Sequence, residues 1–420
     1  MRAPAMKSSP ATLLVALTCA ACALPAQAQQ RPESVTPVPA ISPGGRDIEI
    51  KVPVGLDSRA PAGADLASGL ENTFPAGDGE EGPEAGHGEW VFVPIPFKNA
   101  LLGAGLQFGA GRLYKPAEKP EQKQTSMFGV GGMWAEGGSW AAAAGDRRYW
   151  GQAADIRSTV AGGAGEIFYP VIVVSPNLVN LRIPVSQQFT GGLVKLGYEA
   201  RENLWLNAGF KFAATEIRAT GIEITDDNRR VGLEPRLTID LALLSLSAEW
   251  DTRSDQFYPR DGSLISADVS HADTAYGSDS NYTVYELGYN GYHAFGERHT
   301  LAWRLAGKTV SGDPPFFALP WYGSGVDLRG YTPGTYIGKS LAAAQAEWRW
   351  QATKRIGLVA FGGVGGVWGD VPVFEQDDFL PAGGVGLRWR LTEKFRVNFR
   401  VDYARGKDDG VLLVSVGEAF

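Results

Sequence analysis

The chain has 420 residues, a formal net charge of −7 and many aromatic residues (Trp 12, Tyr 14, Phe 19). An acidic chain lacks the basic face that nucleic-acid binding requires, so we exclude a nucleic-acid partner. Beyond residue 28 no stretch reaches the ~18 consecutive apolar residues of a transmembrane helix, but this does not exclude transmembrane strands.

Residues 1–28 have the pattern of a signal peptide. Arg2 and Lys7 provide the positive start, residues 12–24 are mostly apolar, and residues 26–28 (Ala-Gln-Ala) form a small-residue cleavage site. We therefore expect a secreted protein whose mature chain begins directly after this site.

Both cysteines, Cys19 and Cys22, fall inside the expected signal peptide. The mature chain therefore has no disulfide and no thiolate metal site. The four histidines, at positions 87, 271, 293 and 299, do not form a cluster of metal ligands in the sequence. We expect no metal and no other cofactor.

Residues 29–89 differ in composition from the rest of the chain, with 8 Pro and 10 Gly. Such a composition buries too little apolar surface to offset the entropy of the chain. We predict a mostly disordered periplasmic segment. Its acidic end, from Asp78 to Glu89, is interpreted as a solvated linker.

From residue 90 onward, segments of roughly ten residues alternate apolar and polar positions and are separated by turn residues. In 385–391 the apolar residues alternate with Arg388 and Arg390. In 395–403 five apolar residues, from Phe395 to Tyr403, alternate with polar ones. The apolar positions are rich in aromatic residues and the polar positions in charged ones, which favours a membrane barrel over a soluble sandwich.

The pattern predicts that 90–420 is an all-β domain, a transmembrane antiparallel β-barrel of about sixteen strands. The expected strands are 90–97, 101–114, 125–135, 140–151, 155–170, 184–200, 203–219, 235–251, 262–275, 281–296, 299–310, 338–352, 355–367, 380–391, 394–405 and 410–420. In a membrane such a sheet has to close, because its backbone groups must be paired internally. Pro94 and Pro96 make the first strand the weakest, since proline belongs on an edge or outside a ladder.

The last expected strand ends on an aromatic residue, as is usual for outer-membrane barrels. Counting back in twos from Phe420 gives Glu418, Val416, Val414 and Leu412. We interpret Leu412, Val414, Val416 and Phe420 as the signal that the barrel-assembly machinery recognises during biogenesis.

Three motifs occur in order along the barrel region. They are Trp250 to Asp255 with Tyr258 to Ser263, then Leu328-Arg329-Gly330-Tyr331, then Glu347-Trp348-Arg349. They resemble, respectively, the periplasmic turn, the Arg-Gly-aromatic loop and the following Glu-x-Arg strand of the bacterial surface antigen barrels. That family includes the BamA/TamA-type assembly factors and the two-partner-secretion translocases. The resemblance covers about 90–420, and five expected strands follow the loop, as in the family.

The resemblance implies that the long loop at 313–335 folds into the lumen, where Arg329 pairs with inward acidic residues. A guanidinium in such a site needs these partners. Glu347 is the expected partner, with Arg349 beside it. The family usually carries an Asp at the position of Gly363, so we expect a weaker loop anchor here. Arg329 is either a gating residue or one that only fixes the shape of the loop.

Members of the family that insert or translocate proteins usually carry POTRA domains. Residues 29–89 are too short and too rich in Pro and Gly for one, so the chain resembles a short member without them. The expected function is protein insertion or translocation at the outer membrane of a Gram-negative cell. The alternatives are a passive pore and a structural surface barrel. The expected partners are outer-membrane lipid, the barrel-assembly machinery during biogenesis, and a client or periplasmic protein.

The sequence shows no motif of an enzyme. A G-x-S-x-G motif is absent, and with it the patatin-like lipase arm of the family. The glycine-rich run from Phe361 to Gly366 is followed by neither a helix nor a lysine, so we interpret it as glycines of the barrel wall. Asp251, Asp255 and Asp261 could bind calcium, but a solvated turn is the preferred interpretation. We predict no catalytic, cofactor or metal site.

Overall fold

The computed structural model describes residues 49–51, 89–99, 103–114, 125–150, 155–175, 178–219, 222–223, 230–231, 236–315, 318–323, 327–331, 336–369, 377–392, 395–407 and 410–420. The chain divides into the units Met1–Asp47 and Ile48–Phe420. The expected signal peptide and most of the expected disordered segment lie outside the described residues. Among the described residues, no helix is long and apolar enough to cross a membrane.

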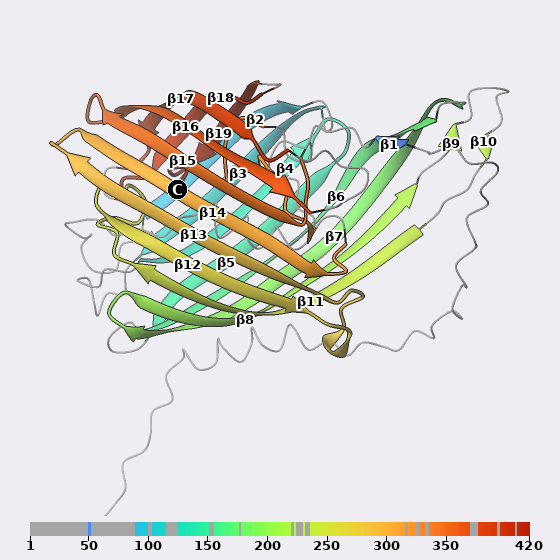
Figure 1. The fold of residues 1–420 in the computed structure, drawn as a ribbon, viewed down its shortest axis with the longest axis horizontal. Coiled ribbons are helices and arrows are strands. Elements are labelled where there is room, and N and C mark those ends of the chain that lie inside the picture. The colour runs from blue at the N-terminus through green and yellow to red at the C-terminus, as the bar shows by residue number, and fades with distance from the viewer. Residues whose placement is uncertain are drawn as a thin grey trace, which may run out of the picture. The chain divides into compact units, whose positions relative to one another are not determined.

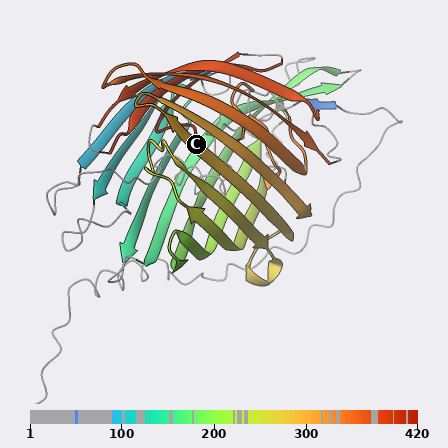
Figure 2. The ribbon, with the colours of Figure 1, turned by 60° about the vertical axis from the view of Figure 1, so that its left-hand side comes forward.

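Sixteen long strands form one antiparallel sheet that curves into a nearly closed barrel (Figures 1 and 2). They are β2 (Glu89–Asn99), β3 (Gly103–Tyr114), β4 (Ser126–Ala135), β5 (Trp140–Trp150), β6 (Ile156–Ser175), β7 (Leu178–Arg201), β8 (Leu204–Ala219), β11 (Arg236–Asp251), β12 (Gly262–Ala272), β13 (Tyr282–Phe295), β14 (His299–Gly312), β15 (Ser340–Gln351), β16 (Ile356–Trp368), β17 (Leu380–Arg390), β18 (Asn398–Arg405) and β19 (Gly410–Val416). The predicted sixteen-stranded antiparallel barrel is confirmed.

Three further strands are short. β9 (Ile222–Glu223) pairs with β10 (Arg230–Val231) between β8 and β11. β1 (Glu49–Lys51) pairs with residues 172–174 of β6, at the end of β6 far from the β11–β12 turn. These three residues fall within the expected segment 29–89, most of which lies outside the described residues.

The outer face of the barrel is apolar. Each of the sixteen barrel strands exposes at least one large apolar side chain, and Leu246 and Leu287 are 67% and 66% exposed. Nine tryptophans are among these exposed residues. A soluble protein rarely leaves so much contiguous apolar surface in water, whereas a membrane barrel presents this surface to hydrocarbon.

The alternation predicted for 385–391 is present, because Val385, Leu387 and Trp389 are exposed while Arg388 is 2% exposed. The alternation predicted for 395–403 is wrong at its start. β18 begins only at Asn398. Before it, Arg396 has a positive φ of 50°, which an extended strand cannot include.

The two ends of the barrel are closed differently. At one end, here called the turn end, the β11–β12 turn (residues 252–261) contributes Phe257 to an apolar cluster with Leu113, Met127, Phe395 and Val397. Leu113 and Met127 belong to β3 and β4, which lie far from β11 and β12 in the sheet order. The cluster therefore crosses the mouth of the barrel. At the other end, the loop end, the described residues of the segment between β14 and β15 pack against the inside of the barrel wall.

One interface in the ring of strands differs from the others. Fifteen neighbouring pairs have extended registers of paired residues, and two of these registers, β6–β7 and β7–β8, contain a local shift. β2 and β19 are hydrogen-bonded neighbours in the sheet order, but no extended register of paired residues joins them in the described part of the chain. We call this interface the seam. Since β2 pairs along its length with β3, we infer that the nitrogens of Pro94 and Pro96, which carry no hydrogen, face the seam.

Leu287 on β13 offers a test of the lipid-facing assignment. Leu287→Arg should lower the free energy of unfolding in phospholipid vesicles by about 2–4 kcal/mol if the side chain lies near the bilayer midplane. Leu287→Ala should cost much less, because alanine is still apolar. Urea titration followed by tryptophan fluorescence measures both. Equal stability of the arginine and alanine variants would contradict the assignment.

Candidate functional site

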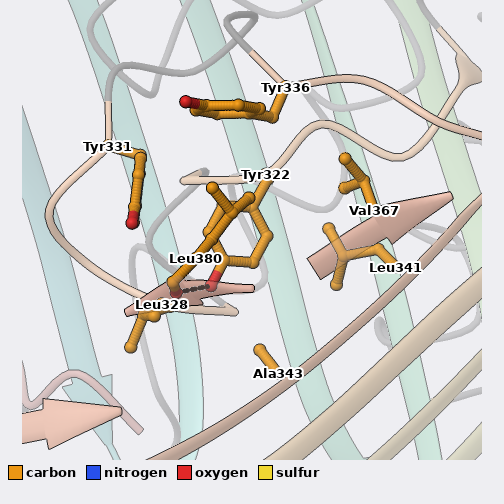
Figure 3. Close-up of a cluster of buried hydrophobic side chains, with 8 residues drawn as sticks. All are labelled: Tyr322, Leu328, Tyr331, Tyr336, Leu341, Ala343, Val367 and Leu380. Atoms are coloured by element: carbon orange, nitrogen blue, oxygen red, sulfur yellow. Dashed lines mark hydrogen bonds between the residues drawn. The ribbon is translucent and has the colours of Figure 1, made fainter. Parts of the chain in front are cut away.

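The segment between β14 and β15, residues 313–339, packs against the inner wall. Figure 3 shows four of its apolar side chains among residues of β15, β16 and β17. The cluster consists of Tyr322, Leu328, Tyr331, Tyr336, Leu341, Ala343, Val367 and Leu380. The hydroxyl of Tyr322 donates to the carbonyl oxygen of Leu380 (2.9 Å), and that of Tyr331 to the carbonyl oxygen of Pro381 (2.6 Å). Apolar packing and hydrogen bonds thus hold the loop to these strands.

Gly330 allows the loop to approach the wall. Its φ is 122°, a value that residues with a side chain rarely adopt. A Cβ atom here would lie 2.9 Å from the Cβ of Ala382 and 3.1 Å from the backbone of Arg405. The Leu328-Arg329-Gly330-Tyr331 motif therefore places its glycine where only glycine fits, and this fixes the position of Arg329.

The guanidinium of Arg329 is completely buried, and every one of its nitrogens has a partner. Nη2 lies 2.5 Å from Glu347 Oε2 and Nη1 lies 2.5 Å from Asp402 Oδ2. Nε donates to Gln345 Oε1 (3.1 Å). The ring of Phe361 lies against its flat face, 3.5 Å from the central carbon. Two carboxylates with full hydrogen bonding are what a buried guanidinium requires.

Asp402 supplies a second carboxylate for Arg329, which the motifs did not predict. An acidic residue is missing at Gly363, and the second carboxylate comes from β18 instead. At Gly363 a Cβ atom would lie 2.7 Å from Leu328 Cδ1, so the glycine makes room for the loop. The alternating pattern placed Asp402 on the polar face of its strand. It could not show that Asp402 binds Arg329, because that residue lies in a distant loop.

The pair formed by Arg329 belongs to a larger group, here called the lumen network: Arg329, Glu347, Arg349, Arg388, Asp402 and Glu418. Arg349 Nε donates to Glu347 (2.6 Å), and Arg388 donates to Asp402 (2.5 Å) and to Glu418 (2.7 Å). Glu347 and Arg349 were expected near the loop, whereas Arg388 and Glu418 were not. Charged groups from β15, β17, β18 and the residues after β19 thus meet around one loop residue.

The residues after β19 do not continue the alternating strand that was expected to reach Phe420. Leu412 is 61% exposed on the outer face. β19 ends at Val416, and Gly417 has a φ of 88°. Phe420 instead accepts a hydrogen bond on its main-chain carboxylate from Arg349 (2.9 Å). Because Gly417 turns the backbone, Phe420 lies against inward arginines and not on the lipid-facing surface.

The three aspartates near the β11–β12 turn each have a partner within the barrel. Asp251 binds Arg253 (2.6 Å). Asp255 accepts from the backbone N–H of residues 257 and 258 (2.8 and 2.9 Å), and its burial raises its pKa. Asp261 accepts from the N–H of Ala294 (3.0 Å). In the described ranges, no three metal-ligating side chains come together.

Comparison with known proteins identifies the family. The model of the Omp85 superfamily domain matches residues 184–415, which is more than half of the chain. The chain therefore belongs to the Omp85 superfamily. It is an outer-membrane protein with a transmembrane β-barrel, as the sequence motifs predicted. A search of curated proteins finds no match.

Solved structures show the same fold. BamA from Haemophilus ducreyi lacking POTRA domains 1–3 is 15% identical, with a TM-score of 0.51 over 84% of this chain and 76% of that one. CdiB from Acinetobacter baumannii is 11% identical, with a TM-score of 0.50 over 78% of this chain and 59% of that one. CdiB from Escherichia coli is 9% identical, with a TM-score of 0.50 over 82% and 62%. This chain thus spans about three fifths of the CdiB chains, and at these identities the likeness concerns the fold.

Removing the buried arginine should destabilise the barrel. Arg329→Ala takes one guanidinium partner from each of two buried carboxylates and empties a buried site, so we expect a loss of about 3–5 kcal/mol in the free energy of unfolding. Combining it with Asp402→Asn should cost less than the sum of the single changes. The control is Arg236→Ala, whose 59% exposed side chain pairs with Glu216 and should be worth less than about 1 kcal/mol. Urea titration in detergent measures all four variants, and an additive double variant would contradict direct coupling.

Restoring the family's acidic residue at Gly363 should not strengthen the anchor. Gly363→Asp forces a Cβ atom against Leu328 and the backbone of Ala344, so it should displace the loop and make it more sensitive to protease. Gly362→Ala is the matched control, because a Cβ there would meet only the carbonyl oxygen of Ala382, at 3.7 Å. Equal protease resistance of the aspartate variant and the unaltered protein would contradict this packing argument.

Proposed function

We propose that this barrel inserts proteins into, or translocates them across, the outer membrane, and that the seam between β2 and β19 is the site of that activity. The observation that carries the proposal is that β2 and β19, although hydrogen-bonded neighbours, share no extended register among the described residues, in a sheet whose fifteen other interfaces have one. Membership of the Omp85 superfamily supports it.

The physical argument concerns backbone hydrogen bonds. In hydrocarbon, leaving one backbone N–H or C=O group unpaired costs roughly several kcal/mol of free energy, because no water replaces the lost partner. A strand edge with unpaired groups is therefore a template for another strand. A client strand that is itself unpaired could satisfy these groups when it meets the seam.

The prolines of β2 keep the seam from closing fully. Pro94 and Pro96 remove two N–H donors from the middle of β2. If their nitrogens face β19, any strand opposite them has two carbonyl groups without donors. Hydrogen bonding across the seam is then weakened by the covalent structure of proline, whatever the conformation of the neighbouring loops.

The lumen network connects the loop to one side of the seam. Arg329 binds Asp402 on β18, and β18 pairs with β19. Glu418, which follows β19, binds Arg388. We propose that the inward loop steadies β18 and β19 while the opposite side of the seam, β2, has no comparable ionic partner among its described residues. Arg329 would then be a positioning residue for the seam.

The alternative of a passive pore is less favoured. The loop occupies the inner wall near one end, and the apolar cluster around Phe257 crosses the other. Both place side chains inside the barrel, where a passive pore would hold water. As further parts of the proposal, residues 1–28 export the chain, 29–89 contact a periplasmic protein, and Leu412, Val414, Val416 and Phe420 are recognised during assembly.

The test is the rate at which a urea-unfolded eight-stranded outer-membrane barrel inserts into liposomes that contain this protein. We expect faster insertion than with empty liposomes. The double variant Pro94→Ala and Pro96→Ala restores two donors, so it should slow insertion and raise the thermal unfolding midpoint. Phe92→Ala, on the same strand, changes a lipid-facing side chain but no backbone donor and should insert clients normally.

The outcomes separate the two parts of the proposal. Liposomes with the unaltered protein that perform no better than empty ones would contradict the function. Equal rates for the unaltered protein and the proline variant would contradict the role of the seam while leaving the function intact.

A further inference from the structure

The lumen network and the inner wall of β13, β14 and β15 beside it hold more guanidinium groups than carboxylates. These strands lie side by side in the barrel (Figure 1). The lumen network, its two neighbouring arginines and Phe420 contain five guanidinium groups and four carboxylates: Arg304, Arg329, Arg349, Arg388 and Arg400 against Glu347, Asp402, Glu418 and the main-chain carboxylate of Phe420. A buried charge without a counter-charge is costly, so this imbalance points to an additional anion.

The side-chain carboxylates have no oxygen to spare. The two oxygens of Glu347 accept from Arg349 and Arg329. Those of Asp402 accept from Arg388 and Arg329, and those of Glu418 accept from Asn398 and Arg388. Every carboxylate oxygen of the lumen network is therefore already engaged.

Arg304 is the cation left over. It lies on β14 and its paired neighbours are Asn290 and Gln345, which are both uncharged. Within the described residues it forms no ion pair, and its buried Nε has no hydrogen-bond acceptor. The guanidinium carbon of Arg304 lies 6.0 Å from the centroid of the Phe420 ring, which is a cation–π contact.

Two further donors, Arg349 and Tyr292, belong to the same set of ring contacts as Arg304. Arg349, 1% exposed, also contacts the Phe420 ring (5.6 Å), and its Nη1 has no acceptor among the described residues. The guanidinium of Arg349 lies 5.6 Å from the ring of Tyr292. Tyr292 is 4% exposed, and its hydroxyl likewise has no partner in the described part of the chain.

We propose that Tyr292, Arg304 and Arg349 form a binding site for a small oxyanion of the phosphate class, with the ring of Phe420 as its apolar wall. Two guanidinium groups and one hydroxyl supply charge-assisted hydrogen bonds to such a ligand. The ligand would neutralise the excess charge beside the anchor of the inward loop. This inference does not depend on the proposed insertion activity.

The test uses the full chain in detergent micelles, with inorganic phosphate as the probe and choline chloride at equal ionic strength as the control. Phosphate should raise the thermal unfolding midpoint with saturation, and the ³¹P signal should broaden on binding. Arg304→Gln should weaken phosphate binding about ten- to a hundredfold, as expected for a charged hydrogen-bonding group. Tyr292→Phe, which removes only a hydroxyl, should weaken it about two- to tenfold.

Lys308→Gln is the matched control on the same strand. Lys308 pairs with Glu286 (2.9 Å), away from the proposed site, so this variant should bind phosphate like the unaltered protein. A response to phosphate no greater than that to choline chloride would overturn the proposal. So would equal phosphate affinity in the unaltered protein and in both site variants, including Tyr292→Phe, which keeps every charge of the fold.

Discussion

The buried guanidinium of Arg329 is the constraint on which the interior of this barrel depends. It can lie inside only because Glu347 and Asp402 neutralise it and Gln345 takes its remaining donor. Small residues make this possible. A side chain at Gly386 would collide with the Asp402 carboxylate. The glycines of β16 and β17 therefore leave the room that the charged side chains need to form their ionic contacts.

The same contacts join parts of the chain that are distant in sequence. The loop motif near residue 329, the strand residue Glu347 and Asp402 on β18 meet at one point. Through Arg388 this point reaches Glu418 beyond β19. One side of the seam is thereby tied to the loop. The other side, β2, is limited by its prolines, so the two edges of the barrel differ in chemistry as well as in position.

Net charge differs sharply between the whole molecule and its interior. The chain carries −7 overall, yet the wall around Arg304 and Arg349 has more guanidinium groups than carboxylates. Charges on the outside of such a barrel are distributed over loops and turns in water, where they are screened. Inside, each one must be paired, and an excess of arginine therefore defines a place for an anion.

The sequence by itself determined the class of fold and the faces of most strands. A side-chain period of two, aromatic residues on one face and charged residues on the other follow from a strand that separates hydrocarbon from a polar lumen. The Leu328–Tyr331 motif and Glu347 were also identified from the sequence, through their resemblance to the family motifs. The tertiary structure alone decided which charges meet, because partners such as Arg329 and Asp402 lie 73 residues apart. It also decided that β18 starts late and that Gly417 turns Phe420 inward, since a local pattern carries no information on where the closing barrel leaves space.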